Sequence, residues 1–302
     1  MRVLVAGATG AIGRPLIRSL KQHGHSVFCL VRSAESTGRV TEMGADAVTG
    51  DALDAASLRS AISRVHPDAV INELTSLPRH YTPAEMAAAA ERDSRVRKEG
   101  NVNLLAAMRE SSVRRYVLQS SGFWYAPGPG LADESSPMAV DASPGVAASA
   151  RVYVELESTA FQASGIDSVA MRYGFFYGPG TWYAKDADMG EQVRQQQVPI
   201  IGAGQGVWSF VHIEDAASAT AAALECTPGV YNIVDDNPRE QREWLPAFAR
   251  YCGAPEPLQV TEQEALTTSG ADSVYYATRL RGASNEKARH EFNFRPRPLE
   301  WL

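Results

Sequence analysis

The chain has 302 residues, of which 44% are hydrophobic and 21% are charged, and its formal net charge is −6. This acidic balance without a basic block argues against nucleic-acid and membrane-surface partners, and the apolar runs fall short of the ~18 residues that span a bilayer. The scattered cysteines Cys29, Cys226 and Cys252 fit neither a disulfide framework nor a metal site, so we expect no metal and a reduced, cytoplasmic setting.

In the first 173 residues, short apolar strands alternate with helical patterns. The strands are expected at residues 2–6, 26–31, 46–49, 69–72, 115–119 and 168–172. The helices are expected at 11–23, 55–65, 83–111 and 146–164. Because helices separate the strands, the pattern predicts right-handed βαβ crossovers and a parallel, doubly wound α/β sheet.

The regular alternation of strands and helices ends after residue 173. Residues 125–145 already read as an irregular loop that is rich in Pro and Gly. Further on we expect strands at 198–201, 207–212 and 230–234, helices at 213–225 and 241–252, and a short helix with a tail at 284–302. We therefore predict a first domain over residues 1–173 and a smaller C-terminal α/β substrate domain over residues 174–302.

A glycine-rich turn directly follows the first strand. It reads Gly7-Ala8-Thr9-Gly10-Ala11-Ile12-Gly13, and a helix begins at once. The first glycine permits a tight turn, the second lets the backbone approach a pyrophosphate, and the third lets the helix pack on the strand. The helix N-terminus offers free N–H groups to the anion. A purely structural turn is the alternative, but the strand–turn–helix context predicts dinucleotide binding by a Rossmann-type domain.

The second strand indicates which dinucleotide binds. It ends at Arg32 and lacks the acidic residue that usually binds the ribose of NAD. The guanidinium of Arg32 suits a 2′-phosphate, so we expect NADP(H) rather than NAD(H), with Arg14 as a second candidate cation. An exposed arginine without a ligand is the alternative. Asp51 and Ala52 are expected beside the adenine, and Thr75 is expected to line the cofactor.

Several segments together resemble the extended short-chain dehydrogenase/reductases, the NAD-dependent epimerase/dehydratase family. They are the glycine turn and three later runs, Ser120-Ser121-Gly122-Phe123-Trp124-Tyr125, Arg172-Tyr173-Gly174-Phe175-Phe176-Tyr177-Gly178 and Phe210-Val211-His212. The resemblance implies that Ser121 takes the place of the family's serine and donates to a substrate oxygen. A serine that merely ends a strand is the alternative.

The resemblance fails at the family's Tyr-x-x-x-Lys pair. If Glu157 is placed on the glutamate that follows the pair, Ser149 takes the tyrosine place and Tyr153 takes the lysine place. The family's asparagine place carries Arg97. We interpret Tyr153 as the candidate proton donor, whose ionisation a nearby arginine would ease. Its alternative role is to pack the helix on the sheet. Further candidate donors are Tyr125, Tyr177 and His212.

Aromatic residues gather in the segments that the resemblance places around the substrate. Trp208 stands where relatives that act on nucleotide sugars carry an arginine, which argues against a diphosphate substrate. The candidate lining residues are Phe123, Trp124, Tyr125, Phe176, Tyr177, Trp182 and Trp208, with Phe175 and Tyr183 beside them. Such walls suit a flat or hydrophobic small molecule.

These observations predict an NADPH-dependent oxidoreductase that reduces a ketone or an activated alkene of a hydrophobic or aromatic metabolite. Two alternatives stay open. One is an epimerase or dehydratase that recycles its cofactor, and the other is an NmrA-like protein that senses NADP(H) without chemistry. The resemblance also implies a homodimer formed through the helices at 83–111 and 146–164.

Overall fold

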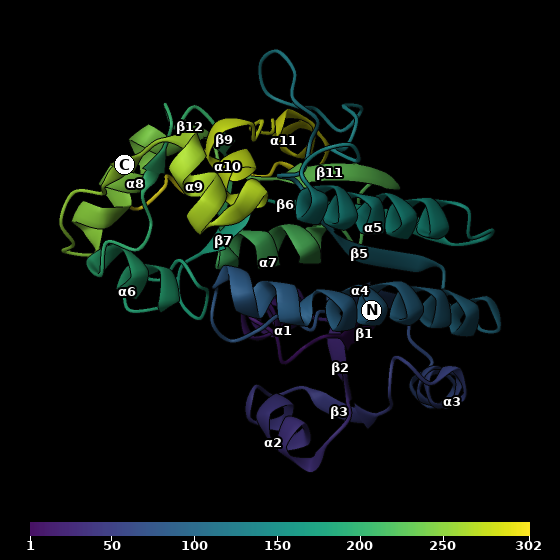
Figure 1. Cartoon of the computed structure of the whole chain (residues 1–302). Coiled ribbons are helices and arrows are strands. Elements are labelled where there is room, and N and C mark those ends of the chain that lie inside the picture. Colours follow the sequence, from purple (N-terminus) through teal and green to yellow (C-terminus); the bar gives the residue numbers. More distant parts are fainter.

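A seven-stranded parallel sheet runs through the computed structural model, which describes residues 1–302 (Figure 1). Its spatial order is β11 (Gly229–Ile233), β6 (Asp167–Tyr173), β5 (Arg115–Ser121), β4 (Ala69–Asn72), β1 (Arg2–Ala6), β2 (Ser26–Val31) and β3 (Asp46–Thr49). The order reverses between β1 and β4, and ligands of such sheets bind at the carboxyl ends of the strands beside that point. The expected doubly wound α/β fold is confirmed.

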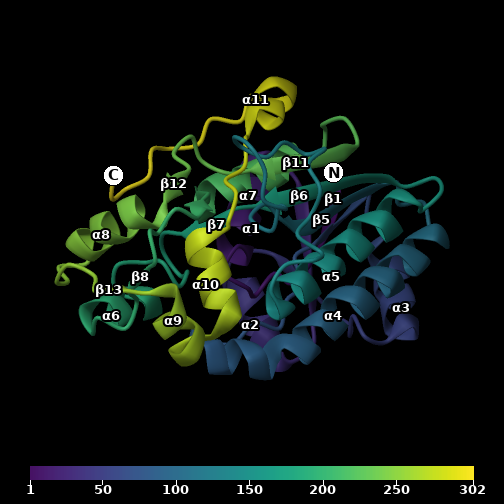
Figure 2. The same ribbon diagram turned by 45° about the horizontal axis from the view of Figure 1, so that its top comes forward.

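Helices cover both faces of the sheet, as Figure 2 shows from a second side. On one face α1 (Gly13–Gln22) packs against α7 (Ile213–Ala222). On the other face α4 (Pro83–Arg109) lies between α3 (Ala55–Val65) and α5 (Pro144–Phe161). The strands alternate between the two layers: Val3 and Val5 belong to the core under α1, whereas Leu4 and Ala6 belong to the core under α3 and α4.

The second unit is built from short elements after β6. They are β7 (Phe175–Tyr177), α6 (Asp188–Arg194), β8 (Ile200–Ile201), β9 (Val207–Trp208), β10 (Phe210–His212), β12 (Arg239–Glu240), α8 (Gln241–Tyr251), β13 (Gln259–Val260), α9 (Glu262–Thr268), α10 (Gly270–Thr278) and α11 (Glu286–Phe292). Its core is rich in aromatic rings, among them Trp244 and Phe248. The sequence had not indicated α6, α9, α10 or α2 (Ala34–Glu42), which are short helices.

One expected strand differs from the structure. The expected strand at 207–212 is two strands, because β9 pairs antiparallel with β12 whereas β10 pairs parallel with β7. The division at residue 173 stays a prediction; beyond it, β11 extends the main sheet next to β6 and α7 packs on α1. The chain therefore returns to the first unit after it has begun the second.

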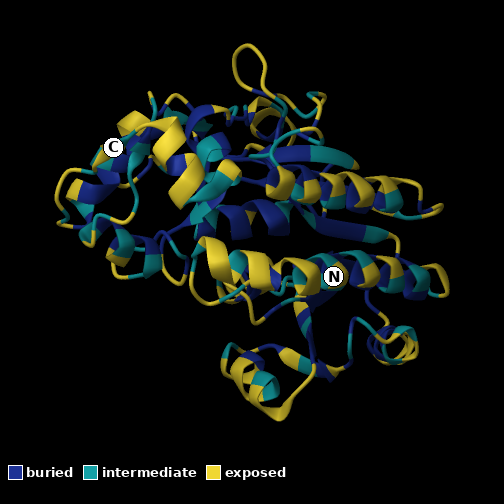
Figure 3. Cartoon of the chain, in the orientation of Figure 1, coloured by how far each residue is buried: buried dark blue, intermediate teal, exposed yellow.

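Burial follows these layers, with the sheet buried and the outer helix faces exposed (Figure 3). None of the helices combines the length and the apolar character needed to cross a bilayer. The cysteines Cys29, Cys226 and Cys252 are buried and unpaired, and no group of three metal-binding side chains comes together.

Candidate active site

The glycine turn connects β1 to α1 at the reversal point of the sheet. Gly7 has a φ of 88°, and a side chain there would collide with the carbonyl oxygen of Glu73. A side chain on Gly13 would collide with the carbonyl oxygen of Ala8. Backbone groups thus approach as closely as a phosphate cradle requires.

The crest of this turn is open to a ligand. Thr9, Gly10 and Ala11 are exposed, whereas the next two residues are buried. Helix α1 begins after Ile12, and no side chain caps its first N–H groups. Free amides at a helix N-terminus bind anions, so the turn fits the pyrophosphate of a dinucleotide.

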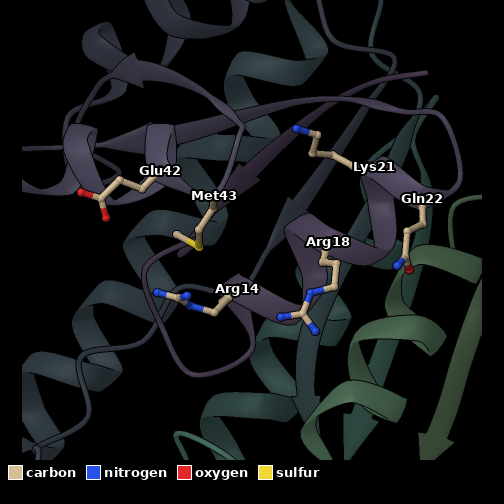
Figure 4. Close-up of a pocket in the computed structure, with 6 residues that line it drawn as sticks. All are labelled: Arg14, Arg18, Lys21, Gln22, Glu42 and Met43. Atoms are coloured by element: carbon tan, nitrogen blue, oxygen red, sulfur yellow. The ribbon is translucent and has the colours of Figure 1, made fainter.

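Two arginines near this turn have no partner. Arg32 follows β2 and Arg14 lies in the first turn of α1; both are exposed, and neither forms a hydrogen bond or ion pair. Arg14 lies in an open hollow of about 460 Å³. Its lining residues are drawn in Figure 4: Arg14, Arg18, Lys21, Gln22, Glu42 and Met43. Of these cations, Arg18 pairs with Glu214 at 3.3 Å and Lys21 donates to the carbonyl oxygen of Gly44. Arg14 and Arg32 are therefore the cations available to a phosphate.

The residues expected along the rest of the cofactor lie at the carboxyl ends of β3 and β4. Ala52 is buried, and its carbonyl accepts from the Asn103 side chain of α4 at 3.0 Å. Asp51 is half-buried, and its carboxylate accepts from the backbone N–H of Leu53. Thr75 is half-buried in the segment after β4.

Ser121, Tyr153 and Arg97 are carried by three different elements, and Arg97 contacts both Tyr153 and the strand that ends at Ser121. Ser121 ends β5, is 2% exposed, and has no hydrogen-bond partner for its Oγ. Arg97 of α4 donates to the Oε1 of Gln119 at 2.7 Å, and Gln119 lies two residues before Ser121, on the same face of the strand. The Arg97 guanidinium lies 5.1 Å from the centroid of the Tyr153 ring.

The acidity of Tyr153 follows from this environment. Burial raises the pKa of Tyr153 to about 12, and the positive charge of Arg97 opposes that rise. Helix α5 contains no lysine. Arg97 also donates to the Oδ2 of Asp93 at 2.7 Å, so a carboxylate balances its charge. Tyr153 is consequently a weak proton donor at neutral pH.

An aromatic wall adjoins Tyr153, and it consists of Phe123, Trp124, Phe175, Trp208 and Tyr276. The Phe175 ring stacks on Phe123 at 4.1 Å and on Trp208 at 4.3 Å between centroids. Trp124 donates from Nε1 to the hydroxyl of Tyr276 at 2.8 Å, and its ring lies 5.4 Å from the Tyr153 ring. None of the wall residues carries a charge.

A second aromatic group joins the two units. Tyr81 stacks on Trp182 at 4.7 Å, and Trp182 donates to the carbonyl oxygen of Arg79 at 3.0 Å. The Tyr81 ring also lies 6.3 Å from the Tyr183 ring. Sequence reasoning missed Tyr81 and Tyr276, because both lie outside the segments that carry the family resemblance.

Three of the expected lining residues, Tyr125, Phe176 and Tyr177, are engaged elsewhere. Tyr125 is fully buried, donates to the Oδ1 of Asn232 at 2.5 Å and accepts from Arg172 at 2.8 Å. Phe176 is half-buried, packs on Tyr173 at 5.1 Å between ring centroids, and lies against the core under α1, whereas Phe175 belongs to the core of the second unit. These contacts come from distant parts of the chain, and the local sequence pattern does not reveal them.

The remaining candidate donors also serve the packing of the second unit. The Tyr177 hydroxyl donates to the carbonyl oxygen of Pro298 at 3.2 Å. The Nδ1 of His212 accepts from the backbone N–H of Glu214 and caps α7. Neither side chain belongs to the group around Ser121.

Glu73 is a buried acid that sequence reasoning missed. It directly follows β4, is 3% exposed, and has no partner for its Oε2. Burial raises the pKa of Glu73 to about 8. A charged residue immediately after the apolar strand at 69–72 was the available signal.

A parallel sheet with an open glycine turn at its reversal point defines a dinucleotide-dependent Rossmann-type protein. The chain belongs to the NAD-dependent epimerase/dehydratase family, whose model matches residues 3–233. The expected family is thereby confirmed, together with its oxidoreductase or epimerase character.

Two relatives that match over most of their length are reductases. The chain is 39% identical to the 3-diazoavenalumate denitrifying reductase of a Streptomyces species, over 100% of this chain and 98% of that one. It is 27% identical to the 2-alkyl-3-oxoalkanoate reductase of Stenotrophomonas maltophilia, over 93% and 86% of the two chains. The UDP-glucose 4-epimerase of Thermus thermophilus, whose structure holds NAD, shares the fold with a TM-score of 0.72, 24% identity, and coverage of 98% and 94%.

Proposed function

We propose that this protein is an NADPH-dependent reductase that removes a diazo group from an aromatic small molecule and leaves hydrogen in its place. The full-length relative that is named a denitrifying reductase of a diazo compound supports this reaction class. The aromatic wall supports the substrate class, because uncharged aromatic faces hold a flat ring and attract a positively charged group such as a diazonium.

The glycine turn and its surroundings fit the cofactor. Gly7 and Gly13 let backbone segments approach where any side chain would collide, and the crest between them is exposed. The unpartnered guanidinium of Arg32, with Arg14 as a second free cation, would hold the 2′-phosphate that distinguishes NADPH from NADH. When bound, the reduced cofactor supplies a hydride.

The observation that carries the proposal is the weak acidity of Tyr153, which lies on a helix without a lysine. Reduction of a ketone creates an alkoxide that needs a proton, whereas a diazonium that gains a hydride loses N2 and gives a neutral arene. In that exchange a C–N bond breaks, a C–H bond forms, and no oxyanion remains. A site whose tyrosine has a pKa of about 12 and whose α5 helix has no lysine suits the second reaction.

The side chains have separate tasks in this reaction. The free Oγ of Ser121 would donate to an oxygen substituent of the substrate ring and fix its orientation. The aromatic wall would contact the ring and exclude water, with Phe175 held between Phe123 and Trp208. Arg97, held by Asp93, would keep the Tyr153 ring in place.

Reduction of a ketone is the second candidate, favoured by the unpartnered Ser121 hydroxyl and by the 2-alkyl-3-oxoalkanoate reductase among the relatives. Its proton would come from Tyr153 or from water. The two candidates differ in one product, because only the diazo substrate releases N2.

The test uses NADPH that carries deuterium at the transferred position. We expect the protein to release N2 from an ortho-hydroxyaryl diazonium salt and to place one deuterium on the ring carbon, above the background without protein. Trp208→Ala should raise KM for this substrate. Turnover of a 3-oxo acid without turnover of the diazonium would establish the second candidate. Bound NADPH without turnover of either substrate would contradict both.

A further inference from the structure

Glu73, Tyr173 and Thr220 form a chain of contacts behind the glycine turn. The Tyr173 hydroxyl lies 2.9 Å from the Oε1 of Glu73 and 2.6 Å from the Oγ1 of Thr220. The Thr220 hydroxyl lies 2.7 Å from the carbonyl oxygen of Ala216. These three contacts need three hydrogens, and the two hydroxyls supply only two. A proton on Glu73 would supply the third: Glu73 would then donate to Tyr173, Tyr173 to Thr220, and Thr220 to the carbonyl.

The surroundings of Glu73 also favour the neutral acid. Its Oε2 is buried without a partner, an arrangement that is costly for a carboxylate. Arg97 faces it from α4 but already pairs with Asp93, so no cation is dedicated to Glu73. The other titratable groups around it are tyrosines, namely Tyr116 of β5, Tyr153 of α5 and Tyr173 of β6.

The position of Glu73 connects it to the cofactor. Strand β4 lies next to β1 in the sheet, and the carbonyl of Glu73 is the atom that a side chain on Gly7 would strike. The glycine turn is where a pyrophosphate binds in this family of folds. A dinucleotide bound there would bring its negative charges to the strand end that carries this carboxyl, and in a buried setting two like charges oppose each other strongly.

We propose that dinucleotide binding is linked to the protonation of Glu73, so that the protein binds the cofactor with Glu73 neutral and loses affinity when Glu73 ionises. The inference rests on dinucleotide binding at the glycine turn. The affinity for NADPH should fall more than the affinity for NADP⁺, because the oxidised nicotinamide carries a positive charge that offsets part of the repulsion. The proton that Glu73 loses on ionisation goes to the solvent, and binding of NADPH recovers it.

The test compares the dissociation constants of NADPH and NADP⁺ for the wild-type protein and Glu73→Gln. The side-chain amide of this variant would still donate to Tyr173 but cannot ionise. Between about pH 7.5 and about pH 9.5 the wild-type Kd for NADPH should rise severalfold, with a limit of about tenfold per pH unit for one linked proton. The variant should bind NADPH with a nearly constant Kd over the same range. Glu110→Gln, at the end of α4, serves as the matched control and should follow the wild type.

A second measurement uses only the wild-type protein. Calorimetric titration with NADPH near pH 8, in buffers of different ionisation enthalpy, should show uptake of a fraction of one proton. A wild-type Kd that does not change with pH, or an equal change in Glu73→Gln, would overturn the inference while leaving the reductase proposal intact. Failure of the protein to bind NADPH or NADH at any pH would overturn the proposed function instead.

Discussion

The guanidinium carbon of Arg97 lies 5.1 Å from the centre of the Tyr153 ring, although α4 carries the arginine and α5 carries the tyrosine. The cation is fixed by Asp93 and Gln119, each at 2.7 Å. It therefore cannot easily leave the tyrosine face, and it supplies a positive charge from a helix other than α5. Only ketone reduction needs a proton, so removal of the Tyr153 hydroxyl distinguishes the two candidate reactions.

The first prediction concerns Tyr153→Phe, which removes the hydroxyl and keeps the ring on Arg97. If hydride addition with loss of N2 is the reaction, kcat should fall by less than about threefold, because a general acid contributes ~10² to 10⁴-fold only where a proton is needed. Steady-state kinetics across the pH range measure this change. A loss of hundredfold or more would show that the Tyr153 hydroxyl transfers a proton in the reaction.

A second prediction concerns the buried ion pair between Arg172 of β6 and Glu157 of α5. The guanidinium donates to both carboxylate oxygens, at 2.8 and 2.6 Å, and Ser120 donates to Oε1 at 2.6 Å. Glu157→Gln leaves a buried cation without its counter-charge and should lower the free energy of unfolding by about 3 kcal/mol. Urea denaturation measures this loss. The exposed pair Arg250–Glu256 is the comparison, and Glu256→Gln should cost less than about 1 kcal/mol.

The glycine turn and Tyr125 show which features of the site could be predicted from the sequence. The strand–turn–helix pattern around Gly7 predicts both the sheet and the phosphate cradle, because that information is local. The role of Tyr125 could not be predicted from nearby residues. Its hydroxyl forms hydrogen bonds with Arg172 and Asn232, which lie 47 and 107 residues further along the chain.

Neighbouring residues on one strand pose a related problem. Phe175 and Phe176 are identical side chains, and only the register of β7 with β10 decides which one joins the aromatic wall. The contacts of Glu73 run through Tyr173 to Thr220, on a helix of the opposite layer. The homodimer through α4 and α5 and the preference for NADP(H) stay predictions.

A third prediction concerns the stability of Glu73→Gln as a function of pH. The pKa of Glu73 rises from 4.5 to about 8 on burial, so between these values the folded state holds a proton that the unfolded state has lost. Wild-type stability should therefore decrease as pH rises through this window, because the unfolded state gains from ionisation. The variant has no such loss, so its Tm should match the wild type at about pH 4 and exceed it increasingly up to about pH 8. If the Tm of the two proteins changes with pH in the same way, Glu73 is not protonated in the folded state.

A fourth prediction tests the choice of cofactor at Arg32. Arg32→Ala removes a guanidinium that has no partner within the protein, so the fold should be unchanged. The Kd of NADPH should rise about 10- to 100-fold, which corresponds to the ~1.5–3 kcal/mol of a charge-assisted hydrogen bond, whereas the Kd of NADH should change little. Arg18→Ala is the control, because Arg18 is occupied by Glu214. An equal rise for both cofactors would show that Arg32 does not recognise the 2′-phosphate.

The last prediction distinguishes two glycines of the same turn. A methyl group on Gly10 would lie 3.3 Å from the carbonyl oxygen of Gly7, which the backbone can accommodate with a small shift. A methyl group on Gly13 would collide with the carbonyl oxygen of Ala8 in a buried place, so α1 would have to move away from β1. Gly10→Ala should therefore fold normally and bind NADPH weakly, since the methyl group crowds the pyrophosphate. Gly13→Ala should lose both thermal stability and binding. Calorimetric unfolding and a fluorescence titration separate the two effects, and normal NADPH affinity in Gly10→Ala would mean that the pyrophosphate does not lie over this turn.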